Sequence, residues 1–472
     1  MSYNSIPSTL EDKVFAYPRF LDLTFDRLFS VLHNLGNPHL KLPPVIHVAG
    51  TNGKGSTIAF LYTILKAHDF KVHVFTSPHL VKLNERFVLA NQEIDDNYLI
   101  ELIQLCEKAA SDIQLTWFEL LTCVAFLSFS QTKADFCLIE TGLGGLHDAT
   151  NIIENPILSL ITSISYDHQD VLGKTLKEIA FQKAGILKKS SVNLIGQNNP
   201  EILDFYQNYI IDNALEGKIF DRDYSFKQID KGFSFQSGNR LLSKHANVRR
   251  VIEDSARKTA VYPYIHKDLS TETTHQSTTV VEFQKKSNME IIVPTLGLQG
   301  QHQLANASLA IMASVVLKKK GYNIQQDIIV DAIKNTQWPG RLQQISSLKS
   351  DAEIWVDGAH NQGGAQVLLK TLDEWSKECD LHIVISLSKT KDPVLFLESF
   401  KHKNYNLYAY QNPSDDFISS SALINISSKM GIKIQEITDL DTFLENLNKS
   451  LSFNTKIIFT GSLYFVGQIM KR

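Results

Sequence analysis

Val45-Ile-His-Val-Ala-Gly-Thr-Asn-Gly-Lys-Gly-Ser-Thr57 is the stretch that decides the fold of this chain. Its apolar start predicts a strand, and a helical pattern of apolar residues begins at Ile58. The glycines between them let backbone amides crowd around an anion, and the start of the helix adds partial positive charge. Lys54 can reach β- and γ-phosphates, and Ser56 or Thr57 can ligate Mg²⁺. The stretch therefore predicts a nucleoside triphosphate site rather than a turn without a ligand.

The spacing inside this loop is shorter than in the common phosphate loop, because only Thr51 and Asn52 separate Gly50 from Gly53-Lys54. The form Gly-Thr-Asn-Gly-Lys-Gly resembles the ATP-dependent amide ligases of the Mur ligase superfamily. In particular it resembles the folylpolyglutamate synthase and dihydrofolate synthase family, including the bifunctional bacterial type. The resemblance implies that ATP is bound by Asn52, Gly53, Lys54, Gly55 and Ser56.

The composition excludes several classes of protein. With 472 residues, 43% of them apolar, the chain is long enough for two hydrophobic cores. A net charge of −3 gives no basic excess for binding nucleic acid or an anionic membrane. The four cysteines lack Cys-x-x-Cys spacing, which argues against a disulfide framework or structural zinc. The N-terminus has no apolar signal core, and the longest apolar run, 120–129, is too short to span a bilayer. We expect a cytoplasmic protein without nucleic-acid or membrane partners.

Strand and helix patterns alternate after the phosphate loop. The predicted strands are 71–75, 135–141 and 157–164, and the predicted helices are 98–110 and 118–129. This alternation predicts an α/β fold whose parallel sheet binds ligands at the carboxyl ends of its strands. From about 198 to 293 the periodicity weakens, and we predict short antiparallel strands interrupted by a poorly ordered insertion at about 240–280.

A second alternation follows a predicted helix at 302–321 and the hinge-like segment Trp338-Pro-Gly-Arg341. Its strands are predicted at 354–356, 381–387, 405–410 and 456–460. We therefore divide the chain into residues 1–335, a P-loop ATP-binding and folate-binding domain, and residues 336–472, a smaller Rossmann-like C-terminal ligase domain. The folate and ligase parts of that division come from the resemblance.

Three predicted strand ends carry side chains that suit a metal ion. Ser77 follows the second strand, and Glu140 ends a buried strand, where an unpaired carboxylate would be costly. His168 follows Asp167 after the third strand. Oxygen ligands with one imidazole suit Mg²⁺ or Mn²⁺ rather than zinc. We therefore predict that Ser77, Glu140 and His168 bind metal together with Ser56.

The resemblance adds a further metal ligand, Lys183 in Gln-Lys-Ala-Gly. The superfamily carries at this place a carbamylated lysine that bridges a second metal. Carbamylation needs a neutral amine, and burial beside other cations lowers a lysine pKa. The resemblance thus implies two Mg²⁺ sites, the second held by carbamylated Lys183.

Segments of both predicted domains resemble the rest of the family's nucleotide site. Gly300-Gln-His-Gln-Leu-Ala-Asn306 places Asn306 on the adenine, and Asp357-Gly-Ala-His-Asn361 places Asp357 on the ribose and His360 near the phosphates. Arg341 can neutralise phosphate and stabilise transition-state charge. Catalysis would then require the domains to close around ATP. The predicted catalytic residues are Lys54, His168, Lys183, Arg341 and His360.

Three segments resemble those that line the family's pterin site. Trp117 and Phe118 either sandwich a flat heterocycle or belong to the core. Asp148 would accept hydrogen bonds from the pterin. The predicted substrate residues are Leu21, Asp22, Leu23, Thr116, Trp117, Phe118, Glu119, Asp148, Ala149 and Thr150.

The chain departs from the family pattern at three places. Leu146 stands where the family has an arginine, Gln362 where it has a proline, and Thr390-Lys-Asp392 is an imperfect Asp-Lys-Asp. The first departure puts part of the substrate or phosphate contact in question.

The resemblance, which covers about residue 14 to the end outside the insertion, implies a monomeric ATP-dependent ligase. Its substrates would be L-glutamate with dihydropteroate, with folate γ-carboxylates, or with both, and an acyl phosphate would yield ADP and phosphate. One alternative is a Mur-type ligase with another carboxylate acceptor. The segments that resemble the family's pterin site argue against this alternative. The other is a non-catalytic ATP-binding switch, weakly favoured by Leu146 and opposed by Lys54, Glu140, His168 and Lys183.

Overall fold

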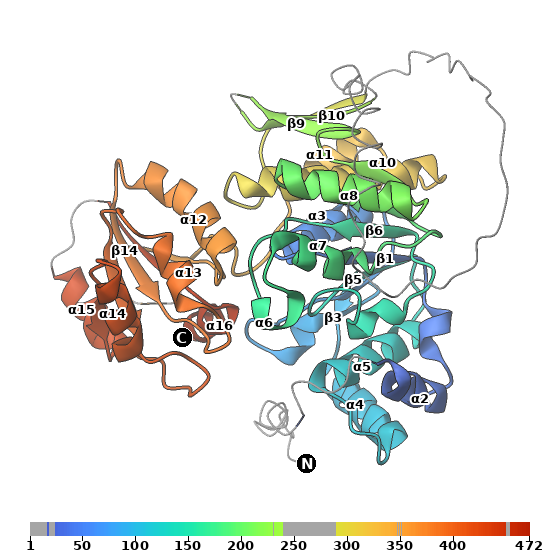
Figure 1. Ribbon diagram of the computed structural model, residues 1–472, viewed down its shortest axis with the longest axis horizontal. Helices are drawn as coiled ribbons and strands as arrows, with labels where there is room; N and C mark the ends of the chain where they lie inside the picture. The colour runs from blue at the N-terminus through green and yellow to red at the C-terminus, as the bar shows by residue number, and fades with distance from the viewer. Residues whose placement is uncertain are drawn as a thin grey trace, which may run out of the picture.

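The computed structural model describes residue 17 and residues 24–229, 231–238, 289–346, 348, 350, 352–449 and 454–472. The predicted insertion at 240–280 and the segment Leu21, Asp22, Leu23 lie outside these residues. The described part contains an eight-stranded, a three-stranded and a six-stranded sheet with helices packed around them (Figure 1). The predicted α/β class is confirmed. No helix in these ranges is both long and apolar enough to cross a bilayer.

The eight-stranded sheet has the order β4-β3-β2-β5-β1-β6-β7-β8. Its neighbours pair in parallel from β2 to β8, and β3 and β4 add an antiparallel edge. Its strands are β1 (Val45–Ala49), β2 (Val72–Phe75), β3 (Phe87–Leu89), β4 (Gln92–Glu93), β5 (Phe136–Glu140), β6 (Leu158–Ile161), β7 (Val192–Ile195) and β8 (Glu216–Ile219). The strands predicted at 71–75, 135–141 and 157–164 are thus present with slightly shorter bounds.

Helices cover both faces of this sheet because its strands are apolar on both sides. Ile46 and Val48 of β1 face a core shared with α3, α10 and α11, whereas Val45 and Ala49 face the opposite side. That opposite side is covered by α2, α4 and α5 and, further along, by α7 and α8. The bounds are α2 (Asp26–Asn34), η1 (Pro38–Lys41), α3 (Lys54–Ala67), η2 (Leu83–Arg86), α4 (Asp96–Ala110), α5 (Trp117–Gln131), η3 (Ala149–Ile152), α6 (Gln169–Leu172), α7 (Leu176–Ala184), α8 (Pro200–Asp212), α10 (His302–Lys319) and α11 (Gln326–Lys334).

The weakly periodic region contains the antiparallel strands expected from the sequence. They are β9 (Tyr224–Gln228), β10 (Phe233–Ser237) and β11 (Met289–Val293), in the order β11-β10-β9. Helix α8, which precedes these strands, was not predicted from the sequence. Asn199 caps that helix, and Pro200 occupies its first turn. Both residues are typical of helix starts, but the apolar residues after them are spaced too irregularly to indicate a helix.

The six-stranded sheet has the order β12-β13-β17-β14-β15-β16 and is parallel except for β12. Helices α12, α13 and α14 cover one face, and α15 and α16 cover the other, as in a doubly wound fold. The bounds are β12 (Gln343–Ile345), β13 (Glu353–Val356), α12 (Gln362–Trp375), β14 (Asp380–Ile385), α13 (Pro393–Glu398), β15 (Asn406–Tyr410), α14 (Ser420–Lys429), β16 (Gln435–Ile437), α15 (Leu440–Asn448), β17 (Thr455–Thr460) and α16 (Leu463–Met470).

One apolar contact between the two large sheets is made by Leu80, which lies in the loop after β2 and packs against the core under α16. Gly467 of α16 permits the close approach, because a Cβ there would lie 1.8 Å from the carbonyl oxygen of Leu80. This contact places the loops of the second sheet over the strand ends of the first.

Candidate active site

The carboxyl ends of β2, β5, β1 and β6, which are neighbours in the sheet, open onto a cleft of about 610 Å³. Loops of the six-stranded sheet form its other wall. This is the edge at which parallel sheets bind ligands. The charged side chains that line the cleft are Arg27, Lys54, Arg86, Lys183, Arg341, Lys391, Glu119, Glu140, Asp148 and Asp167. The cations outnumber the carboxylates, which favours an anionic ligand.

The phosphate loop leads directly into α3, whose first turn has no side-chain cap. Gly53 precedes the helix with φ 88°, a left-handed conformation that favours glycine. The amides of the first turn are therefore free to bind an anion, and the helix dipole favours negative charge there. The amide of Thr51 donates to the carbonyl of Ser163 at 2.8 Å, which anchors the loop. The geometry fits the predicted triphosphate site.

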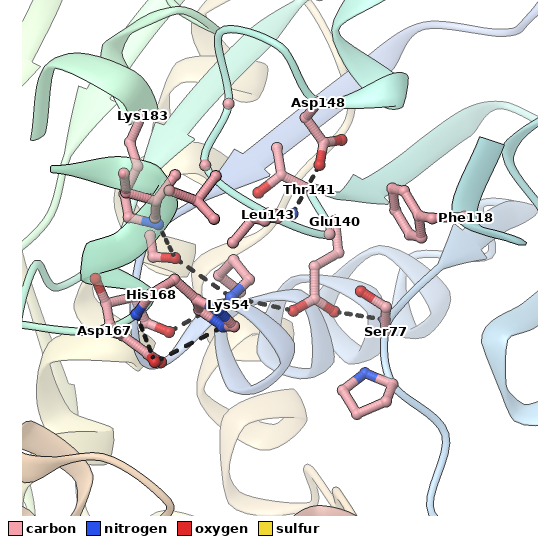
Figure 2. A pocket seen from close by; sticks show the side chains of 18 of the residues that line it. Lys54, Ser77, Phe118, Glu140, Thr141, Leu143, Asp148, Asp167, His168 and Lys183 are labelled. Atoms are coloured by element: carbon pink, nitrogen blue, oxygen red, sulfur yellow. Dashed lines mark hydrogen bonds and ion pairs between the residues drawn. The ribbon is translucent and has the colours of Figure 1, made fainter. Parts of the chain in front are cut away.

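Lys54 extends from this loop to the buried carboxylate of Glu140, with Nζ 3.7 Å from Oε1 (Figure 2). The other carboxylate oxygen of Glu140 accepts the amide of Ser77 at 3.1 Å. Burial raises the pKa of Glu140, and the charge of Lys54 opposes that rise. Ser77 and Glu140 thus bring a hydroxyl and a carboxylate to adjacent strand ends, which are donors that Mg²⁺ prefers.

Lys183 is 4% exposed and lies beside the phosphate loop. It comes from α7, and its Nζ donates to the carbonyl oxygen of Gly50 at 2.9 Å. Burial first, and then the neighbouring charge of Lys54, lower the pKa of Lys183 to about 7. A substantial neutral fraction at neutral pH fits the amine chemistry that carbamylation requires.

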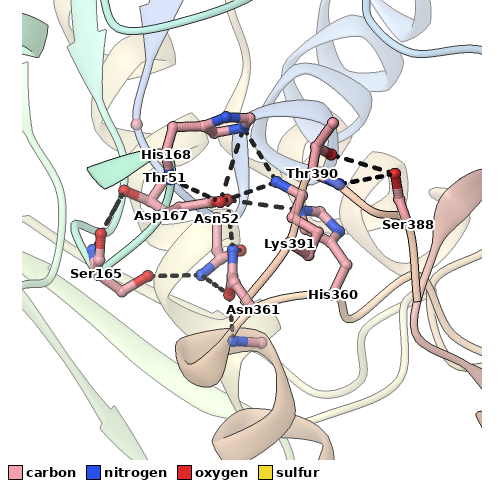
Figure 3. Close-up of polar contacts among 12 residues, drawn as sticks. Thr51, Asn52, Ser165, Asp167, His168, His360, Asn361, Ser388, Thr390 and Lys391 are labelled. Carbon is pink, nitrogen blue, oxygen red and sulfur yellow. Dashed lines mark hydrogen bonds and ion pairs between the residues drawn. The ribbon is translucent and has the colours of Figure 1, made fainter. Parts of the chain in front are cut away.

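Asp167 and His168 contact the second sheet's loops (Figure 3). Lys391 donates to Asp167 Oδ1 at 2.8 Å and to His168 Nε2 at 3.0 Å. Asn361 donates to Asp167 Oδ2 at 2.9 Å, and His360 Nε2 lies 3.6 Å from that same oxygen. Burial would raise the pKa of Asp167, but the neighbouring His360 and the charge of Lys391 hold that pKa well below its usual range. Burial, followed by Lys391, lowers the pKa of His168 to about 4.

The predicted nucleotide residues fall into two groups. Asn52, Gly53, Lys54, Gly55, Arg341 and His360 line the cleft, whereas Ser56, Asn306 and Asp357 are buried and are not among its lining residues. Gln303 donates to Ser56 Oγ at 3.3 Å and accepts from Asn306 at 2.9 Å. The carboxylate of Asp357 accepts the amides of Leu342 and Ala359, each at 2.9 Å.

The predicted pterin residues are likewise divided. Thr116, Phe118, Glu119, Asp148 and Ala149 line the cleft, but Trp117 and Thr150 do not. The ring of Trp117 packs 5.5 Å from that of Tyr17, while Phe118 stacks on Phe75 at 5.8 Å. Trp117 packs on Tyr17 instead of lining the cleft, so of the two only Phe118 is placed to contact a heterocycle there.

Asp148 is the end of a buried hydrogen-bond chain. Its Oδ2 accepts the amide of Leu143 at 2.8 Å, and its Oδ1 accepts the amide and the hydroxyl of Thr150 at 3.0 and 2.5 Å. His47 Nε2 lies 2.8 Å from that hydroxyl. Asp148 thus fixes the loop after β5, and a pterin would have to use a lone pair that these bonds leave free.

Two cleft or near-cleft residues were not named from the sequence. Arg86 lines the cleft and donates to His79 Nδ1 at 3.0 Å, and Gln303 links Ser56 to Asn306. A single arginine or glutamine without characteristic spacing gives no signal in one sequence. Leu146, the residue in place of the family arginine, is not among the cleft residues, and its amide donates to Gln182 O at 2.6 Å.

The metal-ligand types expected from the sequence do not form an all-protein cage. Within the described ranges, no three His, Cys, Asp or Glu side chains group so as to hold an ion. A site with few protein ligands fits Mg²⁺, because this ion usually binds one or two carboxylates and completes its coordination shell with phosphate oxygens and water.

Comparison with known families matches both parts of the chain. Residues 48–214 match the family described as Mur ligase middle domain, and residues 341–472 match the dihydrofolate synthetase C-terminal domain. The dihydrofolate synthase/folylpolyglutamate synthase of Bacillus subtilis (strain 168) is 28% identical over 460 residues, covering 94% of each chain. The probable dihydrofolate synthetase of Schizosaccharomyces pombe is 29% identical over 478 residues, covering 96% of this chain and 98% of its own.

Solved structures share the fold over nearly the whole length. E. coli FolC in complex with ADP, without folate substrate, aligns with a TM-score of 0.78 at 24% identity, covering 98% of this chain and 96% of FolC. E. coli FolC in complex with DHPP and ADP aligns with the same score and coverage.

Proposed function

This chain belongs to the dihydrofolate synthase and folylpolyglutamate synthase family of the Mur ligase superfamily, and we propose that it is an ATP-dependent glutamate ligase. The proposed reaction joins the amino group of L-glutamate to dihydropteroate, giving dihydrofolate, or to the γ-carboxylate of a folate, or to both. The acceptor carboxylate attacks the γ-phosphorus of ATP to form an acyl phosphate. The glutamate amine then attacks the acyl carbon, and phosphate leaves. The other products are ADP and phosphate.

The observation that carries the proposal is the uncapped start of α3 beside Lys54 and the Ser77–Glu140 pair, all at one edge of one sheet. Loop amides and Lys54 can orient a triphosphate there, and Arg341 from the second domain supplies a further cation to the same cleft. Phe118 gives the cleft an aromatic wall on which a pterin can rest.

The proposed metal ligands are Ser77, Glu140, His168 and Lys183, with Ser56. Bound Mg²⁺ would neutralise charge on the β- and γ-phosphates. Ser77 and Glu140 are supported by the hydrogen bond from the Ser77 amide to the Glu140 carboxylate, which brings the two residues together. Carbamylation of Lys183 is supported by its burial and its lowered pKa. Ser56 accepts one hydrogen bond from Gln303 and keeps a second lone pair, whereas His168 would have to give up the hydrogen bond from Lys391 at Nε2.

The test is phosphate release by the purified chain with ATP, Mg²⁺ and L-glutamate, run in parallel with dihydropteroate and with tetrahydrofolate. Release with both acceptors establishes both activities, and release with tetrahydrofolate alone establishes only polyglutamate extension. Release with other carboxylates alone would favour the Mur-type alternative. ATP binding without turnover on any acceptor would overturn the proposal in favour of a binding switch.

Three further features accompany this proposal. Residues 1–335 are proposed as the ATP- and folate-binding domain and 336–472 as the C-terminal ligase domain, which is consistent with the family match that begins at residue 341. A monomeric state and a cytoplasmic location stay predictions, and size-exclusion chromatography with light scattering tests the former.

A further inference from the structure

One lone pair of His168 is already in use by a residue of the second domain. Lys391 Nζ lies 3.0 Å from His168 Nε2 (Figure 3). The ion pair with Asp167 Oδ1 at 2.8 Å favours the ammonium form of Lys391 against the lowering of its pKa by burial. An ammonium carries only hydrogen-bond donors, so in this form Nε2 is the accepting nitrogen of the imidazole. In the neutral ring the proton then sits on Nδ1.

A metal ion cannot share this arrangement. Metals bind neutral imidazole through the lone pair of one ring nitrogen. If the metal binds Nε2, it needs the lone pair that Lys391 occupies. If the metal binds Nδ1, the proton must move to Nε2, which then cannot accept from Lys391. Both binding modes therefore require the contact between Lys391 and His168 to break.

We propose that Lys391 is an internal competitor for the divalent cation at His168, so that metal loading displaces its ammonium. This inference rests on the proposed function, because that function makes His168 a metal ligand. Electrostatic repulsion adds to this competition, because the Lys391 ammonium lies next to the position at which a metal ion would bind His168. By linkage, the factor by which Lys391 weakens metal binding equals the factor by which metal weakens the Lys391–His168 contact.

The structure provides a place for the displaced ammonium. Lys391 also donates to Asp167 Oδ1 at 2.8 Å, and this ion pair needs no part of His168. Asp167 keeps its second partner, Asn361, at 2.9 Å on its other oxygen. Displacement from His168 can therefore occur while the second domain stays attached through Asp167.

The experiment measures Mn²⁺ binding to the full chain without nucleotide, by titration calorimetry and electron paramagnetic resonance. Lys391→Met should tighten Mn²⁺ binding by about tenfold or more, which is about 1.4 kcal/mol. Nitrogen modulation from an imidazole bound to Mn²⁺ should appear at correspondingly lower Mn²⁺ concentration. The matched control is Lys389→Met, which removes a positive charge from the same loop at an exposed position and should leave the affinity unchanged.

His168→Ala separates failure of this inference from failure of the proposed metal site. If His168→Ala weakens Mn²⁺ binding but Lys391→Met leaves it at the wild-type value, competition is overturned and the ligand assignment stands. If all variants bind Mn²⁺ equally and no imidazole modulation appears, the assignment of His168 fails and the inference fails with it. Lys391→Gln, which keeps a neutral donor of similar length, should give an intermediate affinity and serves if the methionine variant does not fold.

Discussion

Asn52 of the phosphate loop and Asn361 at the start of α12 exchange two side-chain hydrogen bonds, at 3.2 and 3.1 Å. Asn361 also donates to Asp167 and caps its own helix through the amide of Gly364 at 2.8 Å. One side chain of the second domain is therefore bonded to the loop that would hold the phosphates and to the strand end that carries His168.

Substitution of Asn361 tests whether this contact positions the two domains for catalysis. Asn361→Ser should keep the helix cap but lose the paired amides, which lowers kcat/KM for ATP by about tenfold or more because each lost hydrogen bond is worth about 1 kcal/mol. Asn361→Ala should show the same kinetic loss and a further loss of about 1 kcal/mol in unfolding free energy. Steady-state kinetics and urea unfolding check both. Wild-type kinetics in the serine variant would show that the amide pair has no positioning role.

Lys54 is expected to act on the triphosphate, because it extends from the loop into the cleft. Lys54→Met should lower kcat by about a hundredfold or more, the usual loss when one charge-stabilising group is removed. Lys66→Met, at the exposed end of the same helix, is the matched control and should leave phosphate release unchanged. Equal activity in the two variants would contradict the triphosphate assignment.

Phe118 and Trp117 should behave differently, since only Phe118 lines the cleft. Phe118→Leu should raise KM for the pterin acceptor while leaving KM for ATP near its wild-type value. Trp117→Leu should lower the melting temperature, through lost packing on Tyr17, with little change in either KM. If Trp117→Leu were the variant with the impaired pterin KM, the cleft would not be the pterin site.

His47 gives the fold a dependence on pH. The side chain is fully buried, and burial first and Lys188 second lower its pKa from 6.5 to about 3. Between these values the unfolded chain binds more protons than the folded protein, so the free energy of unfolding falls as pH drops from about 6.5 toward about 3. In His47→Gln this slope should decrease by up to about 1.4 kcal/mol per pH unit.

Urea unfolding across that pH range measures the effect of His47. His33→Gln, at an exposed histidine, is the control and should keep the wild-type slope. An unchanged slope in His47→Gln would mean that the His47 imidazole titrates alike in the folded and unfolded chain.

The local signals in the sequence were enough for the central fold and part of the site. Apolar runs placed β2, β5 and β6, and the polar residues at or after their ends placed Ser77, Glu140 and His168 at one edge of the sheet. The glycine-lysine loop predicted the start of α3 because its glycines and the apolar residues after it are close together in the sequence.

What the sequence did not show depends on contacts between distant segments. Lys391 and His168 lie 223 residues apart, and the roles of Gln303 and Arg86 follow only from what packs beside them. The different surroundings of Trp117 and Phe118 depend on how α5 is rotated against the sheet, which tertiary packing decides. Asn306 and Asp357, expected at the nucleotide, are instead held by neighbouring protein groups in this structure.

The most direct test of the account follows the oxygen atoms of the acceptor. Dihydropteroate or tetrahydrofolate whose reacting carboxylate is labelled with heavy oxygen is incubated with the chain, ATP, Mg²⁺ and L-glutamate, and the phosphate is analysed by mass spectrometry. A ligase that works through an acyl phosphate transfers one labelled oxygen to the phosphate for each amide formed. Phosphate without label, or glutamylated product without ADP, would contradict the account.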